Sequence, residues 1–175
     1  MPAIVASSLG KIFKVPKSQP GFKGAIQSFF HKETTDVEAV RGATFSIEES
    51  ELVGFLGPNG AGKTTTLKMI SGLLWPDEGQ VRTLGFVPQE RRHEFLKKIA
   101  LVMGNRSQLW WEIAIEESFL LNKEIYELSL SSYKESLDEL VALLDLGDLL
   151  RTPAKKLSLG QRMKAELACA LLHRP

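Results

Sequence analysis

A glycine-rich turn between an apolar segment and a helical pattern constrains this chain more than any other feature. The apolar segment Val53 to Leu56 is expected to be a buried strand, and Lys63 to Ile70 a helix. Between them runs the Walker A pattern Gly-x4-Gly-Lys-Thr, formed by Gly57, Pro58, Asn59, Gly60, Ala61, Gly62, Lys63, Thr64 and Thr65. Because a strand before the turn and a helix after it are the context that confirms this pattern, the chain is expected to have an α/β fold.

Such a turn is suited to binding phosphate groups. Glycines let the backbone come close to a phosphate without Cβ clashes, and successive N–H groups and the helix N-terminus point at the negative charge. Lys63 is expected to neutralise the β- and γ-phosphates of a nucleotide, and the Thr64 hydroxyl to bind Mg²⁺. The pattern alone does not separate kinases, GTPases and transport ATPases.

The composition suits one globular unit that has no overall attraction to polyanions. Of 175 residues 43% are hydrophobic. The sequence has 22 basic and 21 acidic side chains, so its net charge is close to zero and nucleic-acid binding is not expected. The single cysteine, Cys169, cannot form an internal disulfide and has no Cys or His cluster beside it, which fits a reducing cytoplasm without a cysteine metal site. No apolar run approaches the ~20 residues of a membrane helix. At a membrane, the chain is expected to work docked on other chains.

The remaining pattern places the nucleotide turn in a larger α/β plan. Strands are expected at Ile4 to Leu9 and around Phe45 and Ile47. The stretch Val15 to Val37 between them is expected to hold a short amphipathic helix that packs on its own sheet rather than on a membrane or partner, with apolar positions at Phe22, Ile26, Phe29 and Phe30. A dense turn signal follows the nucleotide turn at 75–79.

The second half of the chain is expected to be helical from Glu116 onward. A capping box of Ser132 with Glu135 predicts the start of a second helix, and Gly147 is placed to end that helix. These helices are expected to form a small helical subdomain inserted in the α/β core.

A second motif follows the helical part: Leu157, Ser158, Leu159, Gly160 and Gln161, with Ser158 95 positions after Lys63. Taken alone it is also a plain helix start, because Ser158 with Gln161 forms a capping box. Together with the Walker A pattern at this distance, it resembles the ABC ATPase family, whose signature segment is commonly Leu-Ser-Gly-Gly-Gln. Leu159 replaces the first glycine of that signature. Within the family, the chain is similar to bacterial sodium-export-like ATPase subunits.

The resemblance implies roles for further residues. Phe13 would stack on adenine, although a core phenylalanine at a strand end is the alternative. Ser158, Gly160 and Gln161 would reach the γ-phosphate on the other subunit of a head-to-tail dimer. Gln108 is the candidate for the Q-loop glutamine, since Gln89 comes too early in the chain. Trp110 and Trp111 would form a docking surface for a membrane permease or belong to the subdomain core.

The resemblance also sets the expected extent of the domain. The chain reads as an incomplete ABC ATPase domain: a P-loop NTPase core with a β-rich N-terminal part (1–111), an inserted helical subdomain (112–156), and the signature motif with its helix (157–175). It ends at Pro175, where the family begins its Walker B strand, so the C-terminal part is expected to be missing and no catalytic carboxylate of the family is matched.

The expected function is that of an ATP-binding, energy-coupling subunit of an ABC transporter, with export favoured. It would bind ATP and Mg²⁺, pair with itself or another ATPase subunit, and drive integral membrane permease subunits from the cytoplasmic face of the cell membrane. A nucleotide-binding remnant without hydrolysis, or a soluble ABC protein of translation, are the alternatives.

Overall fold

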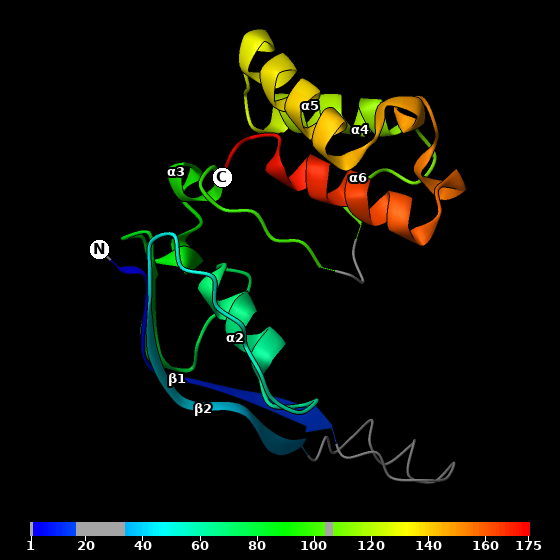
Figure 1. Ribbon diagram of the computed structural model, residues 1–175. Coiled ribbons are helices and arrows are strands. Elements are labelled where there is room, and N and C mark those ends of the chain that lie inside the picture. Colours follow the sequence, from blue (N-terminus) through cyan, green and yellow to red (C-terminus); the bar gives the residue numbers. More distant parts are fainter. Residues whose placement is uncertain (1, 17–33, 104–106) are drawn as a thin grey trace, which may run out of the picture. The chain divides into compact units, whose positions relative to one another are not determined.

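The computed structural model describes residues 2–16, 34–103 and 107–175, and the chain divides into two units, 1–92 and 93–175, each described by itself. The first unit holds the β-structure and the Walker A turn, and the second is helical (Figure 1). Residues 93–111, counted with the core in the sequence-based division at residue 111, belong to the second unit by compactness. The sequence-based division remains a proposal about functional parts.

The first unit is built on an antiparallel sheet with the order β2-β1-β3. Its strands are β1 (Pro2–Pro16), β2 (Thr34–Glu48) and β3 (Glu78–Thr83), and β1 pairs with both neighbours, for instance at Ala6 with Phe45 and with Val81. Helix α2 (Lys63–Ile70) contacts β2 and β3, and the short 3-10 helix η1 (Pro88–Glu90) follows. The core of this unit contains Ala6, Leu9, Val40, Met69, Ile70 and Val81.

The prediction of a buried strand at 53–56 is wrong. The segment is irregular and exposed, with Leu56 94% exposed and Leu52 before it fully exposed. Phe55 alone packs inward, its ring meeting that of Phe45 edge to face at 5.6 Å. A strand needs a neighbour for its backbone N–H and C=O groups, and no strand in the described part of the chain pairs with this segment.

The expected amphipathic helix within Val15 to Val37 lies mostly outside the described residues. The described ends of that stretch are strand, because Val15 pairs with Thr35, and Val37 with Phe13, in the β1–β2 ladder. Both strands are therefore longer than the sequence indicates.

The second unit consists of helices packed around one apolar core. Its helices are α3 (His93–Leu96), α4 (Ile115–Ile125), α5 (Leu130–Leu144) and α6 (Leu159–Leu171), with 3-10 turns η2 (Gly147–Leu149) and η3 (Ala154–Lys156). Helix α6 packs against α4 and α5. Among the fully buried side chains of this core are Ile115, Phe119, Leu146, Ala165, Ala168 and Cys169. None of the helices in the described ranges is long and apolar enough to cross a membrane.

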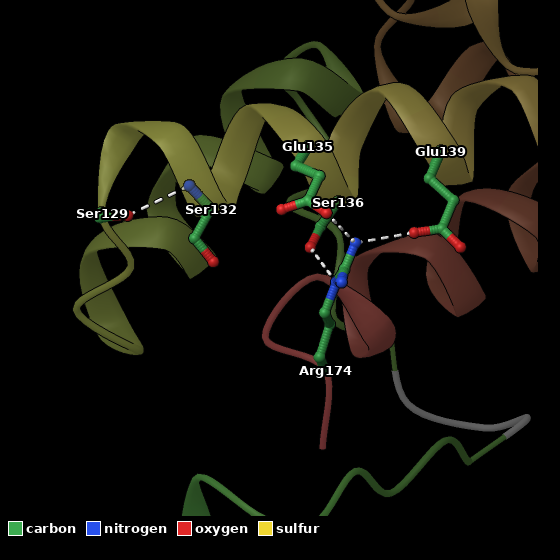
Figure 2. A network of polar contacts seen from close by, with 6 residues as sticks. All are labelled: Ser129, Ser132, Glu135, Ser136, Glu139 and Arg174. Carbon is green, nitrogen blue, oxygen red and sulfur yellow. Dashed lines mark hydrogen bonds and ion pairs between the residues drawn. The ribbon is translucent and has the colours of Figure 1, made fainter.

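The predicted limits of α5 are corrected at both ends. Ser129, not Ser132, is the N-cap residue: its hydroxyl accepts the Ser132 N–H at 3.1 Å, and the helix begins at Leu130 (Figure 2). At the other end Asp145 takes the left-handed conformation (φ 54°) and ends the helix, while Gly147 opens η2. Several Ser residues stand near this start, so composition alone did not identify which one caps the helix.

The end of the chain is tied to α5 by Arg174. Its guanidinium donates to the buried hydroxyl of Ser136 at 2.9 Å and to Glu139 at 2.8 Å, and pairs with Glu135 at 3.4 Å (Figure 2). Glu135, expected to complete a capping box, thus belongs to this network. Exposed ion pairs contribute little to stability, so the bond to buried Ser136 is the part of the network that fixes its geometry.

Candidate nucleotide-binding site

Close packing of the Walker A turn against β2 explains why its last glycine must be a glycine. Gly62 is the N-cap of α2 and has φ 80°, a left-handed conformation that favours glycine. A Cβ built on Gly62 would lie 2.3 Å from the Ala39 carbonyl oxygen, which is backbone of β2. Gly60 also has a positive φ of 85°, but a Cβ there would meet nothing within 4 Å.

Lys63 is held over the turn by its own loop. Its ammonium Nζ donates to the carbonyl oxygens of Gly57 at 2.8 Å and Pro58 at 2.7 Å. Thr66, one turn into α2, is buried and anchors the helix to the turn, because its N–H and its hydroxyl both donate to the Gly62 carbonyl, at 2.8 and 3.0 Å. The positive charge and the helix N-terminus are thereby fixed on the same turn.

A pocket of about 230 Å³ opens at this turn and is lined by Ala39 and by residues 59–65. The first-turn N–H groups of α2 have no partner inside the helix by its geometry, and the helix end carries a partial positive charge. No acidic residue stands in that first turn to compete for it. The donor set is therefore suited to nucleotide phosphates, with the exposed Thr64 hydroxyl next to Lys63 as the oxygen ligand that Mg²⁺ prefers.

Phe13 is not a core residue at a strand end. It lies within β1, which continues to Pro16, and its side chain is 39% exposed. Lys11, whose Nζ lies 5.7 Å from the centre of the Phe13 ring, is paired with Asp77 at 2.9 Å. The ring is thus available for stacking, and its contact with adenine stays a prediction.

The signature segment lies in the second unit and begins α6 as predicted. Ser158 is the N-cap: its hydroxyl accepts the Gln161 N–H at 3.2 Å, and the Gln161 side chain accepts the Ser158 N–H at 2.9 Å. Leu159, at the position of the missing glycine, is 67% exposed, and a Cβ on Gly160 would meet nothing within 4 Å. The capping box is confirmed, and the role of Ser158 toward a second subunit stays a prediction.

Gln108 and Gln89 have different surroundings. Gln89 is buried in the first unit, and its amide donates to the carbonyls of Met69 at 2.8 Å and Leu74 at 3.1 Å, which is a structural role. Gln108 is half-buried in the second unit, and its side-chain amide donates to the Leu101 carbonyl at 3.0 Å. The structure leaves the Q-loop assignment of Gln108 as a prediction.

The two neighbouring tryptophans are on the surface, so the interpretation of them as subdomain core is wrong. Trp110 is 63% and Trp111 50% exposed, whereas Leu109 before them is buried in the core. The Arg162 guanidinium of α6 lies 5.4 Å from the centre of the Trp111 ring.

Sequence reasoning missed Glu166, which is 5% exposed on α6. Its carboxylate accepts hydrogen bonds from the Ser107 hydroxyl and from the Gln108 N–H, the latter at 2.8 Å. The signal was an acidic residue in the buried stripe of a helix that is otherwise small and apolar on that side.

Cys169, one turn further along, is fully buried, and its burial and the nearby Glu166 raise the pKa of the thiol to about 12.

Comparisons with known proteins agree with these observations. Residues 40–175 match the sequence profile of the family described as ABC transporter. The chain is 32% identical over 146 residues to "ABC transporter ATP-binding protein NatA" of Bacillus subtilis (strain 168), covering 83% of this chain and 59% of NatA. It is 29% identical over 169 residues to "Probable multidrug ABC transporter ATP-binding protein YbhF" of Escherichia coli (strain K12), covering 97% of this chain and 29% of YbhF.

A solved structure titled "Structure of ATP binding subunit of ABC transporter" matches 99% of this chain and 63% of its own, with a TM-score of 0.75 and 24% identity. The fold and the Walker A turn define a P-loop protein of the α/β class, as predicted. The chain belongs to the ABC transporter family, within its ATP-binding domain. It spans about three fifths of the length of NatA and less than a third of that of YbhF.

Proposed function

We propose that this chain belongs to the ATP-binding, energy-coupling subunit of an ABC exporter. The observation that carries the proposal is the Walker A turn, where Lys63 Nζ sits 2.8 and 2.7 Å from two loop carbonyls beside a pocket lined by residues 59–65. Lys63, Thr64 and the first-turn N–H groups would bind the phosphates and Mg²⁺, and Phe13 would take the adenine. Export is favoured by the likeness to a relative named as a multidrug transporter protein.

Residues of the second unit support a proposal about the partners. Two ATP-binding chains would associate head to tail, so that Ser158 and Gly160 of one face the γ-phosphate held by the other. Trp110 and Trp111, exposed on the second unit, would dock against a membrane permease subunit on the cytoplasmic side. Aromatic side chains with large exposed area are typical anchors of such contacts.

Nucleotide binding is tested by Lys63→Ala, with Lys68→Ala in the last turn of the same helix as the control. Charge-assisted bonds to phosphate are worth about 1.5–3 kcal/mol, so Lys63→Ala should weaken the affinity for a fluorescent ATP analogue by about tenfold or more. Lys68→Ala should leave it unchanged. Equal affinity in the wild type and in a folded Lys63→Ala protein would overturn the proposal.

The cross-subunit role is tested at Ser158 with a substitution that preserves the helix cap. Aspartate caps a helix as well as serine does, but it would place a negative charge against the γ-phosphate. Ser158→Asp should therefore leave α6 stable and nucleotide affinity nearly unchanged, while abolishing association driven by a non-hydrolysable ATP analogue in sedimentation. Association by Ser158→Asp equal to the wild type would leave Ser158 with its capping role alone.

A further inference from the structure

Three successive backbone N–H groups of the segment 107–111 donate to side-chain oxygens rather than to the backbone carbonyls of a strand or helix. The Gln108 N–H donates to Glu166 at 2.8 Å, the Leu109 N–H to the Ser107 hydroxyl at 3.1 Å, and the Trp110 N–H to the buried Ser118 hydroxyl at 3.1 Å. Loops of this kind usually expose their backbone to water. This segment is instead fastened to α4 and α6 at defined atoms.

Glu166 supplies the fastening on α6. Both of its carboxylate oxygens are used, one by the Ser107 hydroxyl and the other by the Gln108 N–H. Burying a carboxylate is costly unless hydrogen bonds satisfy it, and an alanine or leucine would complete the apolar face of α6 without that cost. The bonded carboxylate gives this face a single position for the segment, which an apolar side chain would not.

A second contact from the same face of α6 reaches the far end of the segment. Arg162 precedes Glu166 by four residues, a spacing that puts both side chains on one side of a helix, and its guanidinium lies 5.4 Å from the centre of the Trp111 ring. Helix α6 therefore holds the segment through Glu166 near Gln108 and through Arg162 at Trp111.

We propose that Glu166 is a positioning residue that locks the segment 107–111 to α6, so that the exposed tryptophans and the start of α6 move as one piece. Ser158 lies eight residues before Glu166, about 12 Å along a continuous helix. A movement of Trp110 or Trp111 is then passed to the start of α6 through the hydrogen bonds to Glu166 and the contact between Arg162 and Trp111. The role of that movement in ATP use rests on the proposed function, whereas the joint itself does not.

The joint is tested without nucleotide, so that its failure is distinct from a failure of nucleotide binding at Lys63. In a Trp75→Phe background, fluorescence comes from Trp110 and Trp111 alone, because the chain has three tryptophans. Time-resolved anisotropy then reports whether these rings turn with the whole unit or swing independently. Amide exchange at Gln108 reports the bond to Glu166.

Glu166→Leu should speed exchange of the Gln108 amide at least tenfold and add a fast component to the anisotropy decay. Glu166→Gln, which keeps an acceptor oxygen for Gln108 and a donor for Ser107, should restore both to wild-type behaviour. Lys164→Ala, on the exposed side of α6, is the matched control and should change neither. A role confined to stability would shift the unfolding midpoint without adding the fast component.

Two results would overturn the proposal. One is a folded Glu166→Leu protein with wild-type exchange and anisotropy, and the other is a Glu166→Gln protein as loose as Glu166→Leu. If Glu166→Leu does not fold, Ser107→Ala takes its place, because Ser107 is exposed and its hydroxyl serves both Glu166 and the Leu109 N–H. Unchanged exchange at Gln108 and Leu109 in Ser107→Ala would also overturn it.

Discussion

The imidazole of His173 stacks flat on the ring of Tyr126, with the ring centres 3.8 Å apart and the planes inclined by 6°. Its Nε2 lies 3.1 Å from the Ile99 carbonyl, which can only accept, so this nitrogen carries the proton. Its Nδ1 is buried without a hydrogen-bond partner in the described part of the chain. Burial lowers the pKa of His173 below its ordinary value of 6.5, against a smaller opposite effect of the bond to Ile99.

This burial predicts that the second unit loses stability in mild acid. The unfolded chain, with a pKa near 6.5, takes up the proton more readily than the folded chain does, so stability rises with pH in this range. The stability that the neutral, buried His173 contributes to the folded second unit is complete above pH 6.5. It declines as the pH falls toward the lowered pKa of the folded state. Urea unfolding between pH 5 and 8 measures it. His173→Phe keeps a stacking ring without the titrating group and should flatten this slope; equal slopes would contradict the assignment.

The corrected start of α5 gives a paired prediction. Ser129→Ala removes the side chain that accepts the Ser132 N–H and should lower the free energy of unfolding by about 1 kcal/mol. Ser132→Ala removes a hydroxyl that caps nothing and should change it by less than about 0.5 kcal/mol. Urea unfolding of the two variants decides between Ser129 and Ser132. The reverse ranking would restore the sequence-based capping box.

The two left-handed glycines of the Walker A turn should differ in their tolerance of alanine. Gly60→Ala adds backbone strain of about 1–2 kcal/mol but no clash. Gly62→Ala adds the same strain and a Cβ 2.3 Å from the Ala39 carbonyl oxygen, so the turn must move away from β2. Gly62→Ala should therefore lose more stability and more nucleotide affinity than Gly60→Ala. Thermal unfolding and nucleotide titration measure the two losses, and equal losses would show that this close approach is unimportant.

Local sequence signals were sufficient where neighbouring residues determine the structure. Helix α2 runs from Lys63 to Ile70 as predicted, and Ser158 with Gln161 caps α6, because these signals act within one turn. The prediction of a strand at 53–56 was wrong because a strand depends on partner strands that its own residues do not specify. Glu166 escaped notice for a similar reason: its partners stand 58 and 59 positions away.

The candidate site likewise has features that the sequence predicted and features that only the structure provides. The Walker A turn could be placed from residue spacing alone. The structure adds the close approach of the β2 backbone to Gly62 and the hydrogen bonds of the Lys63 ammonium to its own loop. The exposure of Trp110 and Trp111 could not be read from the sequence, because either tryptophans or Leu109 could have filled the core, and Leu109 does. Such choices depend on the volume left between helices, which no single segment encodes.

The burial of Cys169 has a practical consequence for labelling the protein. It is the sole cysteine of the sequence, it is fully buried, and its thiol, with a pKa of about 12, is almost entirely protonated at neutral pH. The thiolate is the form that reacts with maleimides. Cysteines introduced at exposed positions, one in each unit, would therefore accept a dye pair while Cys169 stays unmodified. Energy transfer between those dyes would measure how the two units are arranged in solution, in a chain that still has its own cysteine.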